Sequence, residues 1–141
     1  YFSNVLGIDL GMFYKRRDYS TIINGKNPIV AHEFLGDSLV GKDVIIIDDM
    51  IDTAGTICNA ANAIKDLGAR SVRAAATHPV LSGPAVERLE ASDIEELILL
   101  NTVKLPEEKR LDKMTTLSAA PLFAEAMTRV FTNGSISVLF D

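Results

Sequence analysis

The feature that most constrains this chain is an apolar run that meets two adjacent carboxylates and then a stretch of small residues. The run Val44–Ile47 contains only β-branched residues, which is typical of a strand buried in a parallel sheet. Asp48 and Asp49 follow it, and Thr53-Ala54-Gly55-Thr56 then opens a segment of helical period. In parallel sheets, ligands bind beyond the carboxyl ends of the strands. The sequence therefore predicts a functional site directly after this strand.

The remaining pattern alternates short β-rich runs with amphipathic helices. We expect strands at Ile29–Leu35, Val44–Ile47, Val72–Thr77, Leu97–Thr102 and Met114–Leu117, and helices at Thr56–Leu67, Pro84–Ala91 and Pro121–Phe131. The last helix should bury its apolar face, formed by Leu122, Phe123, Ala126, Met127 and Val130, and Ser135–Phe140 should be an extended tail. Such alternation predicts an α/β fold, a mostly parallel sheet flanked by helices that cover both faces.

Composition indicates one soluble domain spanning residues 1–141 and excludes several kinds of partner. The chain is 48% hydrophobic, which is enough to build a core, and its net charge of −5 argues against nucleic-acid binding. Its apolar runs are too short to cross a membrane. A single cysteine, Cys58, and the lack of a signal peptide favour a cytoplasmic protein. Because the sequence begins at Tyr1 without a methionine, we expect a fragment of a longer protein.

The loop Asp52–Thr56 has the composition of an anion-binding site. A helix N-terminus presents unpaired N–H groups and the positive end of the helix dipole, and Gly55 permits close approach of the backbone. Asp48 and Asp49 cannot bind an anion, but they can accept hydrogen bonds from sugar hydroxyls or help to hold a hydrated magnesium ion. A sugar phosphate satisfies both requirements. The alternative is that the acids merely end a strand and the threonines merely cap a helix.

Four stretches resemble one enzyme family and follow its order. Val44–Thr56 resembles the motif that binds phosphoribosyl pyrophosphate (PRPP) in type I phosphoribosyltransferases and PRPP synthetases. Its residues are most similar to the synthetase version of the motif. Lys15–Arg17 resembles the basic start of the synthetases' catalytic flexible loop. Ala76–Ala85 resembles the strand-to-helix segment after the motif, and Ser135–Phe140 resembles the C-terminal signature. The chain is thus similar to the C-terminal half of a PRPP synthetase, with a type I phosphoribosyltransferase-like fold.

This resemblance implies a ribose-phosphate diphosphokinase, which transfers the diphosphoryl group of ATP to C1 of ribose 5-phosphate in the presence of Mg²⁺ and forms PRPP. It implies that the 5-phosphate is bound by Asp52, Thr53, Ala54, Gly55 and Thr56, and the ribose hydroxyls by Asp48 and Asp49. It also implies that Lys15 and Arg17 close over the ATP phosphates in a loop spanning about residues 15–28. A solvated basic turn is the alternative for this triplet.

The resemblance extends to regulation and assembly. Ser135, Ser137 and Phe140 resemble positions of an allosteric phosphate or ADP site between subunits, with a packed terminal strand as the alternative. The adenine-binding residues and the catalytic histidine of the family lie in a missing N-terminal half, so His78 and His32 are expected to be structural. The family resemblance implies a homohexamer. Two other functions stay open: a phosphoribosyltransferase that consumes PRPP, and a non-catalytic regulatory subunit.

Overall fold

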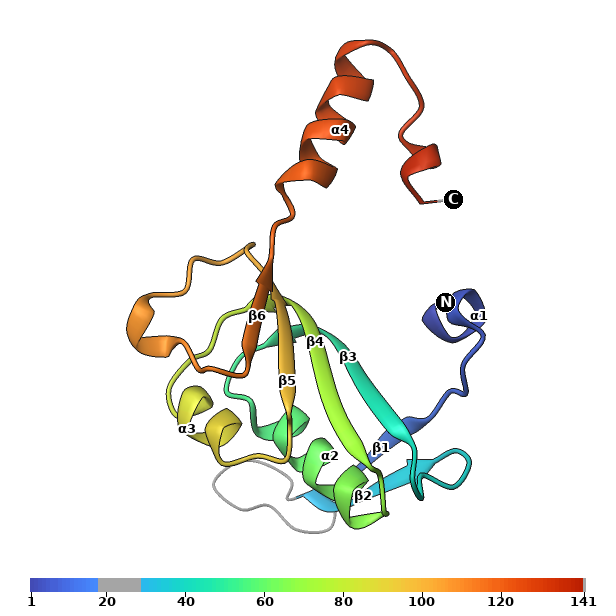
Figure 1. Ribbon diagram of the computed structural model, residues 1–141, viewed down its shortest axis with the longest axis vertical. Helices are drawn as coiled ribbons and strands as arrows, with labels where there is room; N and C mark the ends of the chain where they lie inside the picture. The colour runs from blue at the N-terminus through green and yellow to red at the C-terminus, as the bar shows by residue number, and fades with distance from the viewer. Residues whose placement is uncertain (18–28, 141) are drawn as a thin grey trace.

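The computed structural model describes residues 1–17 and 29–140, and its centre is a four-stranded parallel sheet (Figure 1). The strands are β3 (Asp43–Ile51), β4 (Ser71–Pro79), β5 (Glu96–Leu100) and β6 (Met114–Leu117), and they lie side by side in chain order. All three neighbouring pairs are parallel. The carboxyl ends of the four strands therefore meet at one edge, and the loops that leave this edge are the loops in which a ligand site is expected.

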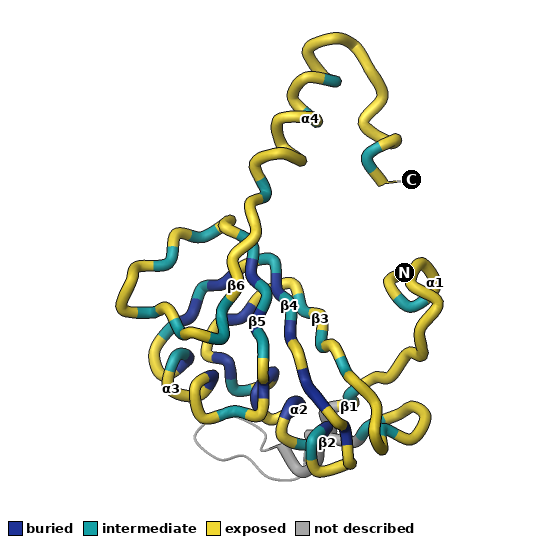
Figure 2. The backbone as a smooth tube through the Cα atoms, viewed as in Figure 1, coloured by how far each residue is buried: buried dark blue, intermediate teal, exposed yellow. Residues whose placement is uncertain are grey.

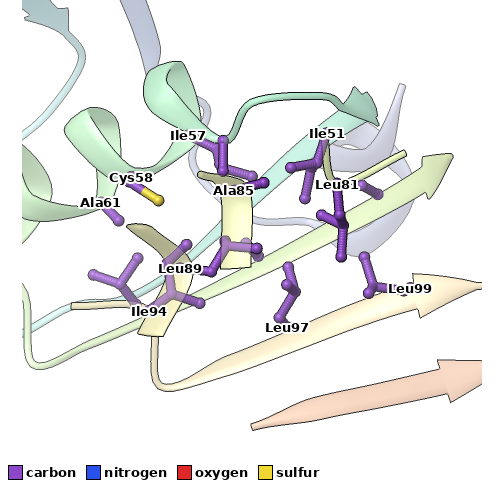
Figure 3. Packing of buried hydrophobic residues seen from close by; sticks show 14 of the residues in the cluster. Ile51, Ile57, Cys58, Ala61, Leu81, Ala85, Leu89, Ile94, Leu97 and Leu99 are labelled. Carbon is purple, nitrogen blue, oxygen red and sulfur yellow. The ribbon is translucent and has the colours of Figure 1, made fainter. Parts of the chain in front are cut away.

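One face of this sheet is covered by helices α2 (Gly55–Asp66) and α3 (Ala85–Glu90). Alternation along each strand directs every second side chain to this face, where Val72, Ala74 and Leu97 are completely buried. They pack in one cluster with α2 residues such as Ile64 and with Leu89 of α3 (Figure 3). Small alanines on β4 let the helices approach the sheet closely. The core thus lies between the sheet and these two helices.

The predicted α/β fold with a parallel sheet and flanking helices is confirmed. The opposite face of the sheet, however, is not covered by the described residues, so the expectation that helices cover both faces is wrong for this part of the chain. Ile45 and Ile47, which alternate with the inward residues of β3, are 42% and 44% exposed. Leu117 on β6 is 50% exposed. The order of strands and helices along the chain was predictable. The sequence alone does not show whether a helix covers each face of the sheet.

A separate antiparallel hairpin precedes the sheet. It joins β1 (Met12–Arg17) to β2 (Ile29–Leu35) and follows a short helix, α1 (Phe2–Leu6). The second strand was predicted with its observed bounds, whereas β1 and α1 were missed. Polar residues interrupt β1, and its pairing with β2 depends on residues far along the chain. Residues 18–28 of the predicted flexible loop lie outside the described residues.

The C-terminal segment differs most from expectation. Helix α4 (Ala120–Phe131) forms where it was predicted, but it extends away from the sheet and none of its residues is buried (Figures 1 and 2). Phe123 is 61% exposed and Met127 is 70% exposed, so the predicted burial of this face is wrong for the described chain. The tail, predicted to be extended, contains a 3-10 helix, η2 (Ser137–Leu139). Another 3-10 helix, η1 (Glu107–Lys109), lies between β5 and β6.

Element boundaries were otherwise predicted to within a few residues, with one informative difference. The strand expected to end at Ile47 continues through both acids to Ile51, because β4 extends equally far and pairs with it. Backbone pairing thus overrides the low strand propensity of aspartate. Within residues 1–17 and 29–140, no helix is long and apolar enough to cross a membrane.

Candidate functional site

The turn from β3 into α2 presents a row of free backbone N–H groups. Ala54, the residue before the helix, has φ 59° and ψ 1°, a left-handed conformation that is unfavourable for alanine. A left-handed residue followed by helical residues forms a concave arrangement of N–H groups that suits anions. The N–H groups of Thr53, Ala54, Gly55 and Thr56 make no hydrogen bond to any described residue. This row is available to bind an anion.

The loop is open to solvent. Asp52, Thr53 and Thr56 are exposed, while the Ala54 side chain turns into the core and is 5% exposed. Among the described residues, no side chain therefore fills the space above the N–H groups at Thr53 and Thr56, which is the condition that the predicted site requires. A cavity of about 500 Å³ lies at the same edge of the sheet, around the residues that follow β5, and is lined by Leu100, Asn101, Val103, Lys104, Leu105, Pro106, Glu107, Arg110 and Thr116.

The connection between β4 and α3 holds the loop from one side. The backbone N–H groups of Val80 and Leu81 donate to the Ile51 carbonyl at 3.0 and 3.1 Å, and the Ser82 N–H donates to the Asp52 carbonyl at 2.9 Å. Leu81 is completely buried and has φ 50°, so packing keeps this connection in an unfavourable conformation. The segment Ala76–Ala85 thus supports the start of the loop Asp52–Thr56 directly.

The tandem acids lie within β3, beside the loop. Asp48 is half-buried and Asp49 is exposed, which follows the alternation of a strand. The Asp48 Oδ1 accepts a hydrogen bond from the Asp49 N–H at 2.9 Å. Burial raises the pKa of the Asp48 carboxyl above its ordinary value, and the Asp49 carboxyl acts in the same direction. Two adjacent carboxylates favour hydroxyl donors or a cation.

His78 has a structural environment. Thr102 donates from its hydroxyl to the Thr77 carbonyl at 2.6 Å, so its oxygen must accept the hydrogen bond that it shares with His78 Nδ1 at 3.0 Å. The proton of this imidazole is therefore on Nδ1, and the ring links the end of β4 to the residues after β5. This arrangement is consistent with a structural His78, which stays a prediction.

The remaining predicted site residues lie in other parts of the fold. Lys15 and Arg17 are on β1, opposite His32 and Ile29 of β2. The rest of the predicted catalytic loop lies outside the described residues. In the tail, the Ser135 hydroxyl accepts a hydrogen bond from the Ser137 N–H at 3.2 Å.

The tail is not a packed terminal strand, because Phe140, next to the 3-10 helix, is 68% exposed. Among the described residues, no group of three His, Cys, Asp or Glu side chains is placed to hold a metal ion. The structure thus joins the loop to the β4–α3 connection by hydrogen bonds and places the acids near the carboxyl end of β3, but it does not bring the tail to them.

Together, these elements define an α/β protein with an exposed loop of unpartnered N–H groups, among the described residues, at the carboxyl edge of a parallel sheet. The fold is similar to that of phosphoribosylpyrophosphate synthetase from Mycobacterium smegmatis, with a TM-score of 0.81 and 38% identity, over 94% of this chain and 40% of that chain. The family model for the phosphoribosyl synthetase-associated domain matches residues 18–141, and the chain belongs to this family.

Curated relatives are longer than this chain. A ribose-phosphate pyrophosphokinase from Halalkalibacterium halodurans is 54% identical over 127 residues, which are 90% of this chain and 38% of the relative. One from Clostridium perfringens is 48% identical over 140 residues, which are 99% of this chain and 42% of the relative. The chain therefore spans about two-fifths of the length of the relatives that it matches.

Proposed function

We propose that this chain is the ribose 5-phosphate-binding part of a ribose-phosphate pyrophosphokinase. The observation that carries the proposal is the row of four N–H groups from Thr53 to Thr56, which have no partner among the described residues and lie beside Asp48 and Asp49. A phosphate placed against the row receives several charge-assisted hydrogen bonds at once. Vicinal ribose hydroxyls then donate to the carboxylates. The names of the relatives and the family match support the same assignment.

In the proposed reaction, the C1 hydroxyl oxygen of ribose 5-phosphate attacks the β-phosphorus of ATP. A new oxygen–phosphorus bond forms, and the bond between the β-phosphorus and the α,β-bridging oxygen breaks. AMP leaves with the bridging oxygen and the electron pair of that bond, and the proton of the C1 hydroxyl is released to solvent. The role of this chain is to fix the sugar. The phosphate loop holds one end, and the acids hold the hydroxyl side, so that C1 is presented in one orientation. Lys15 and Arg17 are proposed to neutralise charge on the transferred phosphoryl oxygens.

Magnesium fits the site only as a hydrated ion. Asp48 and Asp49 provide two adjacent carboxylates, and Mg²⁺ retains several waters and commonly uses one or two carboxylates together with substrate phosphates. When bound, the ion would supply charge neutralisation to the phosphates. The residues of this chain do not form a complete protein shell around it, because no third acid or histidine joins the pair among the described residues.

The complete activity is proposed to need the residues of the longer relatives that this chain does not match. By the family resemblance, these residues bind the adenine and provide the catalytic histidine, and the longer protein is a cytoplasmic homo-oligomer. Ser135, Ser137 and Phe140 are proposed to take part in its regulation by phosphate or ADP. Alone, the 141-residue chain should bind ribose 5-phosphate weakly and should not turn over.

A chimaera tests this proposal. This chain would replace the matching segment of the Halalkalibacterium halodurans enzyme, and formation of PRPP from ATP and ribose 5-phosphate would be measured. We expect activity, and we expect the double substitution Asp48→Asn and Asp49→Asn to reduce it by at least about 100-fold, as loss of charged partners of a reacting group does. Wild-type turnover in the double variant would remove the acids from the mechanism. Consumption of PRPP with a base, without ATP-dependent formation, would favour a phosphoribosyltransferase instead.

A further inference from the structure

Arg88 reaches the phosphate loop from a different element. Its guanidinium Nη1 donates a hydrogen bond to the Thr53 carbonyl at 2.9 Å, across 35 positions of sequence. The backbone of Arg88 is fixed by its own helix, since Ala85 and Leu89 of α3 are completely buried in the core (Figure 3). A rigid helix thus places a positive charge and a donor on one peptide of the loop. The family motif alone did not reveal this contact.

The planarity of the peptide bond gives this contact a consequence. In a trans peptide, the carbonyl and the following N–H point in opposite directions. Because Arg88 holds the Thr53 carbonyl, the Ala54 N–H must point away from α3. The Ser82 N–H holds the Asp52 carbonyl in the same manner, so the Thr53 N–H also points away from the β4–α3 connection. Two consecutive N–H groups are therefore kept free of the protein that supports the loop.

The conformation of the loop shows why such support is needed. Ala54 is left-handed, with φ 59°, and an alanine leaves this region unless its surroundings hold it there. Gly55 is the next residue, and a Cβ added to it would lie 3.4 Å from Arg88 Nη1. The guanidinium is thus in close contact with the loop at both Thr53 and Gly55. No other described side chain donates to the Thr53 carbonyl.

We propose that Arg88 is a positioning residue of the phosphate loop, which acts through its hydrogen bond to the Thr53 carbonyl. This bond keeps Ala54 left-handed and directs its N–H toward the 5-phosphate of the sugar. The inference rests on the proposed function, because the anion in question is the phosphate of ribose 5-phosphate. Arg88 does not contact the ligand; it determines where the N–H donors of the loop point.

Isothermal titration calorimetry of the 141-residue chain with ribose 5-phosphate tests the proposal. Four proteins are compared: the unsubstituted chain, Arg88→Met, Arg88→Lys and Arg70→Met. Arg70 is the matched control, because it is an exposed arginine that pairs with Asp43 at the amino end of β3, at the opposite edge of the sheet from the loop. Its removal changes the net charge by the same amount as removal of Arg88. Thermal unfolding of each protein is measured in parallel.

We expect Arg88→Met to raise the Kd for ribose 5-phosphate about tenfold, as loss of a hydrogen bond to a charged group does. The Kd of Arg88→Lys, which retains a donor, should lie between those of the unsubstituted chain and Arg88→Met. The Kd of Arg70→Met should stay within about twofold of that of the unsubstituted chain. The tenfold loss should persist in 0.5 M salt, because a hydrogen bond is less sensitive to screening than a distant charge. The unfolding midpoints should change little, since Arg88 is exposed.

Three results would overturn the inference. One is a Kd for Arg88→Met within about twofold of the unsubstituted chain. Another is full restoration by Arg88→Lys together with loss of the effect in salt, which would show that only charge matters. The third is equal weakening by Arg70→Met. If the unsubstituted chain itself does not bind ribose 5-phosphate, the proposed function fails and this inference fails with it. Binding that is unaffected by Arg88→Met leaves the proposed function standing and removes only the inference.

Discussion

Helices α2 and α4 have the same length but opposite environments. Each has twelve residues and an apolar face of helical period. In α2, that face is covered by the sheet and α3, and five of its residues are buried: Ile57, Cys58, Ala60, Ala61 and Ile64. In α4, no residue is buried, although the apolar face contains Phe123, Met127 and Val130 (Figure 2). An amphipathic pattern therefore predicts which side of a helix is apolar, but not what covers that side.

The difference also separates two roles. Packing fixes the position of α2, and this fixes the N–H groups at its start relative to the acids of β3. Precise placement of these groups requires such a rigid support. By contrast, α4 makes few contacts in the described structure, so truncation of its exposed side chains should have little effect on the folding of this chain. The predictions below test this comparison.

The two helices should differ most in how much stability is lost when an apolar side chain is truncated to alanine. Ile64→Ala removes a side chain that is 2% exposed, and we expect it to lower the free energy of unfolding by about 2–5 kcal/mol. Val130→Ala on α4 removes one that is 62% exposed, and its effect should be below about 0.5 kcal/mol. Urea denaturation followed by circular dichroism measures both. Equal costs would show that α4 is packed in solution.

A glycine substitution inside α4 should cost about 1 kcal/mol more stability than one at Ala54, the residue before α2. Ala126→Gly in the interior of α4 should destabilise that helix by about 1 kcal/mol, because glycine has low helix propensity. Ala54→Gly should be close to neutral, since relief of the left-handed conformation offsets the loss of a buried methyl group. Helicity and unfolding midpoints report these changes. A large loss of stability in Ala54→Gly would mean that the left-handed conformation is not strained.

The raised pKa of Asp48 predicts a small dependence of stability on pH. Because folding favours the neutral carboxyl, ionisation of Asp48 disfavours the folded state, and its stabilising contribution is lost as the pH rises through the raised pKa. Asp48→Asn should therefore raise the unfolding midpoint at pH 7 by up to about 3 °C and should give no gain below pH 4. Differential scanning calorimetry at both pH values measures this. A gain at pH 4 that equals the gain at pH 7 would contradict the assignment.

The smallest effect on folding is expected for the exposed face of α4. The double variant Phe123→Ser and Met127→Ser removes two exposed apolar side chains, and its stability should change by less than about 0.5 kcal/mol. Its self-association should decrease, because contiguous exposed apolar residues promote contact between molecules. Sedimentation velocity at several concentrations compares it with the unsubstituted chain. Unchanged association would show that this face does not contribute to it.

The sequence predicted the parallel sheet, the helices and the turn from β3 into α2 because each has a local pattern. The β-branched run at Val44–Ile47 favours a strand, and the small residues after Asp52 favour the start of a helix, without reference to distant residues. The strand β1 was missed because its pairing is set by distant residues. The exposure of α4 was not predictable either, since periodicity contains no information on the covering residues.

The same distinction applies to the site. Asp48, Asp49 and the loop were proposed as a site from charge and position in sequence, whereas Arg88 was not, because its partner Thr53 is 35 residues away. The sequence offered one indirect signal, which was the family resemblance of the segment that leads into α3. Contacts between elements require coordinates.

The central claim is that the N–H groups of Thr53–Thr56 bind the phosphate of ribose 5-phosphate. Titration of the ¹⁵N-labelled chain, followed by NMR, tests it most directly. The claim predicts that ribose 5-phosphate shifts the amide signals of these four residues in a saturable manner, and that ribose without phosphate does not shift them. If ribose 5-phosphate leaves these four signals unchanged at saturating concentration, the claim is contradicted.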